Sequence, residues 1–397
     1  MINKELQLIT EQDLKALVEN AVREKNDIDY KRELTIETDA DKKEFLADVS
    51  SLANAGGGDL IIGIIEDRAT GEPNEVKGIV LDNVDKEIQR LDSMIREGIS
   101  PRIPAQTICP IKLENGNYVL ILRISQSWIS PHRVIYKGSD KFYSRNSSGK
   151  YPLNVEELRS AFTLSETLRN KINNFRTERI SKIIAGDTPV NCLDGSKIVL
   201  HLIPLISFNR TYHYDIKSVA DSPSYRSLMY PINHAPNWFR YNIDGYITHT
   251  SGRDEKSFSY FQLYQNGIIE AVEAFMLAAD NEKKIIPSDT FEDEIIKAVT
   301  RYLKLLQIMK VAVPIFIYLT LVGVKGYRYL IYTIHPFLDK FPIDKNILNL
   351  PEHIVENYSE KAPAILKSSF DVLWNASGFS EDNYYKAGEW NFPKHYL

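Results

Sequence analysis

Hydrophobic positions in the first third of the chain recur at helical spacing in three stretches. The spacing predicts an amphipathic helix over residues 10–23 and another over 84–98. A third helix is expected to start at Thr38 or Asp39, either of which can cap it, and to end at the glycines 56–58. These helices need a sheet to cover their apolar sides.

Strand-like patterns fill the gaps between these helices. Residues 28–34 alternate, 60–65 form a buried apolar run, and 108–124 hold two strand-like runs around an Asn-Gly pair that predicts a hairpin. A further helix is expected from Asn154, where a capping-box pattern begins. The alternation of helices and strands predicts one mixed α/β domain over residues 5–163.

The second half has a different texture. A polar amphipathic helix over residues 164–190 is expected to link the halves, and 191–397 to form a separate α+β domain. Helical patterns fall at 268–279 and 292–311, and the apolar run 311–324 is expected to be a buried strand. The predicted fold class is therefore α/β (mixed α+β), with two domains.

Composition excludes several classes of protein. The 397 residues carry 48 Lys and Arg against 53 Asp and Glu, so the net charge is 48 − 53 = −5, and nucleic acid would have to be bound by local patches. Two cysteines, Cys109 and Cys192, are too few for a disulfide framework. The first residues lack a signal-peptide core, and the run 311–324 is shorter than a bilayer span. We expect a cytoplasmic protein without a membrane partner.

The three glycines at 56–58 do not form a phosphate loop. In such a loop a strand precedes the glycines and a helix follows them, whereas here the helix comes first. The glycines are therefore expected to end the helix with positive φ angles. Gly63, inside the next strand, indicates close approach of another backbone or a ligand, or tight packing.

Acidic residues stand at the ends of the predicted elements. Glu24 closes the first helix, Asp29 and Lys31 share one face of the following strand, and Glu66 and Asp67 end the next. Carboxylates that converge in this way can hold Mg²⁺ or Mn²⁺, and a neighbouring ammonium can stabilise charge on a phosphate. Such spacings also arise by chance, so a solvated charged face is the competing interpretation.

Residues 131–150 combine cations with aromatic side chains. This pattern is typical of segments that bind phosphates and stack bases, although a solvated hairpin face would have the same composition. The candidate nucleic-acid-binding residues are Arg133, Lys137, Lys141, Tyr143 and Arg145.

A second aromatic cluster lies in the C-terminal half. It is either a stacking platform or part of a strand core, and cores of this kind are commoner. Its members are Tyr212, Tyr214, Trp238, Phe239, Tyr241 and Phe261.

Taken together, two segments resemble the Schlafen AlbA-type (AlbA-2) domain. The first contains Glu24, the strand Asp29-Tyr30-Lys31, the helix end Asn54-Ala55-Gly56-Gly57-Gly58 and the strand end Ile62-Gly63-Ile64. The second is Phe142-Tyr143-Ser144-Arg145-Asn146, followed by Tyr151-Pro152. The resemblance covers about residues 10–163, with Asp29 where Glu is usual in the family and Ile65 where an acid is often found.

The resemblance implies a function on nucleic acid. In Schlafen proteins two such lobes form a basic groove with a three-carboxylate metal site that cuts tRNA and rRNA. Carried over to this chain, Glu24 and Asp29 match two carboxylates, and the third is either Glu66 or Asp67. Since one lobe is visible here, a complete groove implies a homodimer or a higher homo-oligomer.

Two hypotheses follow. The first is an endoribonuclease that depends on Mg²⁺ or Mn²⁺ and acts on structured RNA such as tRNA, plausibly in anti-phage defence. Its catalytic residues would be Glu24, Asp29, Lys31 and Asp67, with Glu66 as the alternative metal ligand. The second is a DNA- or RNA-binding regulator without turnover, in which the carboxylates hold Lys31 or Arg145 in a structural network.

Overall fold

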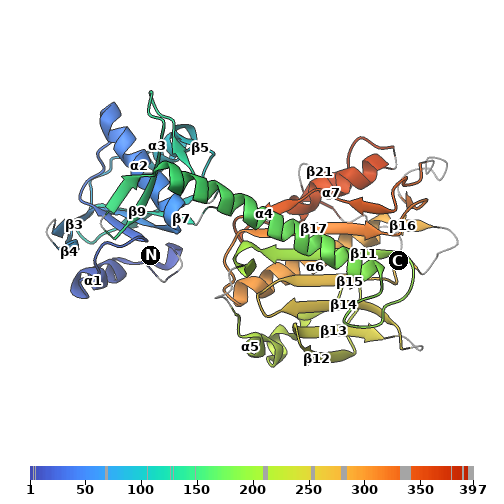
Figure 1. Ribbon diagram of the computed structural model, residues 1–397. Helices are drawn as coiled ribbons and strands as arrows, with labels where there is room; N and C mark the ends of the chain where they lie inside the picture. Colours follow the sequence, from blue (N-terminus) through green and yellow to red (C-terminus); the bar gives the residue numbers. More distant parts are fainter. Residues whose placement is uncertain are drawn as a thin grey trace. The chain divides into compact units, whose positions relative to one another are not determined.

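The chain divides into two compact units, Met1–Thr167 (unit 1) and Leu168–Leu397 (unit 2), drawn in Figure 1. The computed structural model describes residues 1–2, 4, 6–67, 70–104, 106–125, 127, 129–147, 149–208, 213–251, 255–278, 284–330, 341–376, 378–386 and 389–391. Tyr212 lies outside these residues. Among the helices described, none is long and apolar enough to cross a bilayer.

Unit 1 is built on a four-stranded sheet in the order β1-β2-β7-β6. Its strands are β1 (Ile28–Lys31), β2 (Gly57–Ile62), β6 (Gln106–Lys112) and β7 (Tyr118–Ser125). β1 runs parallel to β2, with Asp29 beside Leu60, and the other pairs are antiparallel. The predicted hairpin of two strands is confirmed as β6 and β7.

Helices cover both faces of this sheet because its central strands are apolar on both sides. α2 (Asp39–Ala55) and α3 (Val84–Gly98) pack on the face that carries Leu60 and Ile62. The opposite face, which carries Ile61, is covered by α1 (Glu11–Glu19) through Leu14. The short η1 (Leu6–Leu8) precedes α1 in the chain. Successive strand residues point to opposite faces, which explains why the apolar run is uninterrupted.

Two smaller sheets complete unit 1. One has the order β10-β9-β8-β5, and the other is the hairpin of β3 and β4. Their strands are β3 (Ile64–Asp67), β4 (Glu72–Val76), β5 (Ile99–Ser100), β8 (Arg133–Val134), β9 (Lys141–Asn146) and β10 (Gly149–Pro152). β9 lies against α2.

The first helix is shorter than predicted. α1 ends at Glu19, and Ala21 has a φ of 46°, which takes the chain out of the helix. Glu24 therefore lies in the connection to β1 and not at a helix end. In this connection its N–H donates to Gly71 O at 3.0 Å. The amphipathic pattern continues to residue 23, but Asn20, Ala21 and Arg23 are exposed, so the pattern extends beyond the helix itself.

A single helix, α4 (Val155–Ile184), contains the boundary between the two units. Its start is fixed as expected, since Glu157 N donates to Asn154 Oδ1 at 2.9 Å and Asn154 N donates to Glu157 Oε2 at 2.8 Å. These reciprocal hydrogen bonds satisfy N–H groups that a helix start leaves unpaired.

Unit 2 is built on an antiparallel sheet in the order β12-β13-β14-β15-β11-β17-β19, with β20 also paired to β17. Its strands are β11 (Lys197–Pro204), β12 (Trp238–Asn242), β13 (Gly245–Ser251), β14 (Ser257–Tyr264), β15 (Ile269–Glu273), β17 (Ile315–Val322), β19 (Ile347–Asn349) and β20 (His353–Val355). The strand expected within 311–324 is thus confirmed as β17.

Helices flank both faces of this sheet. α6 (Ser288–Ile308) and α7 (Ala362–Ala376) pack on one face in a large core, while Ile180 and Ile183 of α4 pack on the other. The remaining elements are α5 (Ile216–Ala220), η2 (Leu205–Phe208), η3 (Pro223–Met229) and the short strands β16 (Ile285–Pro287), β18 (Arg328–Leu330), β21 (Tyr385–Lys386) and β22 (Glu389–Trp390).

One predicted element of unit 2 is wrong. Residues 268–279 were expected to be helical, but Ile269–Glu273 form β15, paired with β14 on one side and β11 on the other. All five residues of β15 are buried, including Glu270 and Glu273, so both faces of the strand are covered where a helix pattern was inferred. Hydrophobic periodicity does not separate a short strand buried on both faces from a buried helix.

Candidate functional site

Glu24 and Asp29 meet beside β1, where the two carboxyl groups interact with each other. Asp29 belongs to β1, where it lies beside Leu60 of β2, and it is 3% exposed. Glu24 reaches it from the preceding connection because its Oε1 accepts from Tyr30 N at 2.7 Å. Tyr30 is itself fixed, since its OH donates to Val22 O at 2.8 Å.

Their environments push the pKa values of these two acids apart. Burial, the hydrogen bond to Asp29 and its charge raise the pKa of Glu24 to about 8, and the charge of Glu66 raises it further. Burial also acts to raise the pKa of Asp29, but the charges of Lys31 and Arg145 outweigh burial and lower it. At neutral pH the pair therefore holds one proton, on Glu24.

Glu66 is the acid of β3 that belongs to this group. Its charge acts on Glu24, and its buried Oε2 has no hydrogen-bond partner. Asp67 is the next residue of the same strand, whose pairing with β4 is irregular between Ile65 and Glu66. The structure thus brings Glu24, Asp29 and Glu66 into one electrostatic cluster.

Two cations neutralise Asp29 within the cluster. Arg145 Nη2 donates to Asp29 Oδ1 at 3.0 Å, and Lys31 Nζ lies 3.0 Å from Asp29 Oδ2. Burial acts to lower the pKa of Lys31, but the charges of Asp48 and Asp29 outweigh burial and raise it, so Lys31 stays charged. Arg145 is only 5% exposed, and its Nε and Nη1 have no hydrogen-bond partner.

Asp48 is a site residue that the sequence analysis did not single out. This buried acid of α2 lies 3.8 Å from Lys31 Nζ and accepts from Lys150 Nζ at 2.7 Å. Lys150 also contacts Glu44 Oε1 at 2.5 Å. An acid inside the apolar stretch Leu46–Leu52 was the available signal, because a buried carboxylate requires a partner.

The carboxylate oxygens of this cluster are chemically suitable ligands for a divalent cation, but their arrangement is less suitable. Carboxylate oxygens are the ligands that Mg²⁺ and Mn²⁺ prefer, and the buried Asp29 Oδ2 receives no hydrogen bond of good geometry. Yet no group of three His, Cys, Asp or Glu side chains among the described residues is arranged to hold a metal. Glu24 and Asp29 fit such an ion as a pair, with Glu66 in electrostatic range.

The cations predicted to bind nucleic acid separate into two groups. Arg133, Lys137 and Lys141 are exposed or partly exposed on and around β8 and β9, with Arg133 3.0 Å from Asp140 and Lys137 2.9 Å from Asp39. The prediction that Arg145 binds nucleic acid is corrected, because its side chain is buried against Asp29 and cannot follow a nucleic-acid backbone over the surface. The ring of Tyr143 packs against the α2 core.

Asn54 attaches this basic segment to the rest of unit 1. Its Oδ1 accepts from His132 N at 2.6 Å, and its Nδ2 donates to His132 O at 2.9 Å and to Tyr143 O at 2.7 Å. The amide at the end of α2 therefore fixes the strand that carries Arg145. This gives the asparagine before the glycines a structural role.

The glycines behave as expected. Gly56 and Gly57 have φ angles of 135° and 86° and end α2. At Gly63, whose φ is 111°, an added Cβ would lie 3.0 Å from Gly78 Cα. Gly63 also accepts hydrogen bonds from Lys77 N and Gly78 N, so another backbone does approach closely here.

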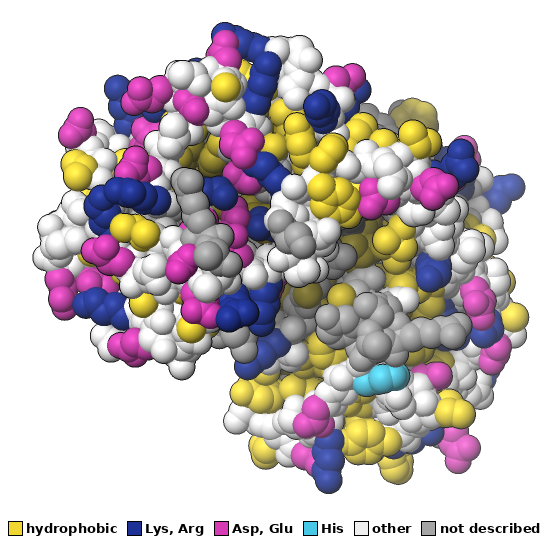
Figure 2. Space-filling model, turned by 60° about the vertical axis from the view of Figure 1, so that its left-hand side comes forward, with side chains coloured by type: hydrophobic (Ala, Val, Ile, Leu, Met, Phe, Trp, Pro, Cys, Tyr) yellow, Lys and Arg dark blue, Asp and Glu magenta, His cyan; other side chains and the backbone are white. Residues whose placement is uncertain are grey.

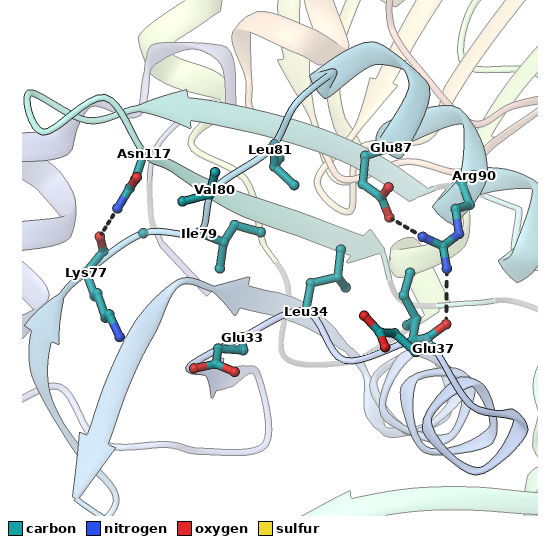
Figure 3. Close-up of a pocket in the computed structure, with 12 residues that line it drawn as sticks. Glu33, Leu34, Glu37, Lys77, Ile79, Val80, Leu81, Glu87, Arg90 and Asn117 are labelled. Carbon is teal, nitrogen blue, oxygen red and sulfur yellow. Dashed lines mark hydrogen bonds and ion pairs between the residues drawn. The ribbon is translucent and has the colours of Figure 1, made fainter.

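A separate cavity of about 410 Å³ opens elsewhere on unit 1 (Figure 3). Its floor is apolar, with Leu34, Ile79 and Leu81, and Glu87 pairs with Arg90 at its rim. None of the clustered acids lines it. The wider surface is electrostatically mixed, because Lys and Arg are interspersed with Asp and Glu over the face seen in Figure 2.

Comparisons with known proteins agree with this geometry at the level of the domain. Residues 24–154 match the Schlafen, AlbA_2 family. A comparison with curated proteins returned no match.

Two solved structures align with about a third of the chain. One is the DIP2311 protein from Corynebacterium diphtheriae, with 19% identity, 36% of this chain and 26% of that chain covered, and a TM-score of 0.26. The other is the N-terminal domain of a protein related to the ATP-dependent DNA helicase RecG, from Nitrosomonas europaea, with 20% identity, 35% and 89% covered, and a TM-score of 0.27. Both scores are too low to carry a functional argument.

Proposed function

Since residues 24–154 form a Schlafen AlbA_2 domain, we propose that unit 1 acts on nucleic acid, and specifically that it hydrolyses phosphodiester bonds of structured RNA with the help of Mg²⁺ or Mn²⁺. The observation that carries the proposal is the carboxyl pair of Glu24 and Asp29, whose pKa values are pushed apart beside Lys31 and Arg145. Separated pKa values in one cluster are typical of acid–base chemistry.

Each member of the cluster has a distinct task in this proposal. Glu24 and Asp29 would hold the cation, with Glu66 in electrostatic range, and the cation when bound would supply positive charge to the phosphate and lower the pKa of a water molecule. Lys31 and Arg145 keep Asp29 ionised and so preserve it as a ligand. Arg145 acts only through Asp29, because its Nε and Nη1 are buried.

The proposed substrate contact lies on β8, β9 and their connection. Arg133, Lys137 and Lys141 project from a segment that Asn54 fixes to α2. Positive side chains on a fixed segment bind the backbone of a folded RNA by charge and shape, without reading its sequence. Structured RNA such as tRNA is therefore the substrate class to test first.

Cleavage of tRNA by purified protein in the presence of Mn²⁺ tests the proposal. The variant Glu24→Gln keeps the hydrogen bond to Tyr30 N possible but cannot become a carboxylate, so the cleavage rate should fall at least about 100-fold. Asp67→Asn removes an acid of the same strand as Glu66 and should cleave at the wild-type rate. Equal rates for wild type and Glu24→Gln would refute the assigned site.

Binding without turnover is the second candidate. It is favoured by the two cations on Asp29 and by the absence, within the described residues, of three acids arranged for a metal. In that case Asp29 and Asp48 would serve only to hold Lys31, Arg145 and Lys150. Salt-sensitive binding of RNA or DNA that survives EDTA, with no product after prolonged incubation, would select this alternative.

A further inference from the structure

Strand β12 leaves one side open at an edge of the unit 2 sheet (Figure 1). In the described part of the chain, β13 is the only strand paired with it, in a continuous register from Trp238 beside His249 to Asn242 beside Gly245. An edge strand exposes N–H and C=O groups on which another strand can pair, and proteins usually block such edges with proline, lysine or a bulge. β12 contains no proline, lysine or bulge, and its one charged residue, Arg240, donates to Pro189 O.

Aromatic side chains line this open edge on both faces. Trp238 is 58% exposed and Tyr241 51%, large fractions for rings held in a sheet. Trp238 stacks on His249 and Tyr241 packs on Tyr246, each its neighbour across the strand pair. Residues of β13 thus hold these rings in place from one side. The apolar surface that remains exposed is available to a second strand, as at a strand-pairing interface.

The charges around β12 favour a protein over a nucleic acid. Arg226 lies over the ring of Phe239 at 5.3 Å, and Arg240 Nη2 donates to Pro189 O at 2.9 Å. Tyr241 OH donates to Asp221 Oδ1 at 3.2 Å, which brings an acid to the same edge. Two arginines and an acid thus share this edge, whereas polyanion binding depends on a surplus of positive charge that is available to phosphates.

We propose that β12 pairs antiparallel with β12 of a second copy of this chain, around a two-fold axis at Phe239. In this register Phe239 lies opposite Phe239, and Trp238 lies opposite Arg240 of the second copy, which gives one aromatic pair and two cation–π pairs. An axis at Arg240 would instead place two guanidinium groups opposite each other. The strand is therefore self-complementary in one register, independently of the function proposed for unit 1.

Light scattering of the full chain during gel filtration tests the pairing. The wild type should have twice the mass of one 45.5 kDa chain, and Phe239→Lys, which sets two ammonium groups face to face, should have the mass of one. Phe341→Lys is the matched control, because Phe341 is 59% exposed in the same unit but lies outside β12. A wild-type monomer at every concentration, or a dimer that Phe239→Lys leaves intact, overturns the proposal.

Cysteine cross-linking tests the register without depending on the folding of Phe239→Lys. In a chain with Cys109→Ala and Cys192→Ala, Phe239→Cys should form an intermolecular disulfide readily, and Arg240→Cys should form at least about tenfold less, because its thiols would be offset. Preferential cross-linking at position 240 contradicts the register. A monomer in which Trp238→Ala weakens single-stranded RNA binding would show instead that β12 is a nucleic-acid surface.

Discussion

The carboxyl group of Glu24 owes its chemistry to its neighbours. Asp29 is kept ionised by Lys31 and Arg145, so the proton of the pair is held by Glu24, whose pKa is raised to about 8 by burial and by the adjacent acids. In the proposed function a metal ion and this proton would compete for the same oxygens, because the ligand has to be deprotonated. Metal binding would therefore be coupled to pH at this single residue.

The affinity of the wild type for Mn²⁺ should rise with pH until Glu24 has lost its proton. Below pH 8 the gain should be roughly tenfold per pH unit, with about one proton released per ion bound. Isothermal titration calorimetry in buffers of different ionisation enthalpy measures both quantities. Glu24→Gln should bind weakly at all pH values and Asp67→Asn like the wild type, and an affinity that is flat from pH 6 to 8 would contradict the coupling.

Gly63 is a backbone position where unit 1 tolerates a side chain poorly. Gly63→Ala should lower the free energy of unfolding by roughly 1–3 kcal/mol, because φ is 111° and the new Cβ would meet Gly78 Cα at 3.0 Å. Gly138→Ala is the control: its φ is also positive, at 78°, but the Cβ enters open space, so the loss should stay below about 1 kcal/mol. Urea unfolding compares the two, and equal losses would show that the close approach is unimportant.

Among the elements, α4 is anchored to the unit 2 sheet by a buried network around Glu270. Arg179 of α4 donates to both oxygens of Glu270, at 2.8 and 2.9 Å, and Tyr260 OH donates to Glu270 Oε1 at 2.8 Å. Burial acts against ionisation, but His201 and Arg179 lower the pKa of Glu270 to about 2. The helix thus supplies the positive charge on which a buried carboxylate of the central sheet depends.

Arg179→Met should detach this part of α4 from the sheet. The substitution keeps much of the side-chain volume but leaves Glu270 with less compensating charge, so unit 2 should lose about 3–5 kcal/mol of stability. Arg159→Met, an exposed position near the start of the same helix, should change stability by less than about 0.5 kcal/mol. Chemical denaturation followed by circular dichroism measures both, and a loss under 1 kcal/mol for Arg179→Met would show that the network contributes little.

Over the whole molecule, positive charge is local and does not form a field. The net charge is −5, and cations are interspersed with acids on the surface in Figure 2; in the proposed function Arg133, Lys137 and Lys141 would make the salt-dependent contacts with phosphates. Two of these three already lie beside acids, which RNA would have to displace. We therefore expect binding of moderate affinity with a shallow salt dependence.

Replacing Arg133, Lys137 and Lys141 with Ala should reduce the slope of log K against log salt by roughly 2–3, since each phosphate contact contributes about 0.7–0.9. Fluorescence anisotropy with tRNA over a range of KCl concentrations measures the slope. A control variant with Lys304, Lys345 and Lys361 replaced, all exposed on unit 2, should keep the wild-type slope. The same reduction in both variants would place RNA contacts outside β8 and β9.

The sequence alone predicted several elements of unit 1 and singled out Glu24 and Asp29, which the structure brings together. Local signals sufficed for α2, α3 and the hairpin of β6 and β7, because capping residues, helical spacing and an Asn-Gly turn act over a few positions. Only the tertiary structure decided which charges pair: that Arg145 is buried on Asp29, that Glu66 rather than Asp67 acts on Glu24, and that Asp48 joins them. The tertiary structure also decided that residues 269–273 form a central strand and not a helix. Burial and ion pairing join residues distant in sequence, and no local pattern encodes those contacts.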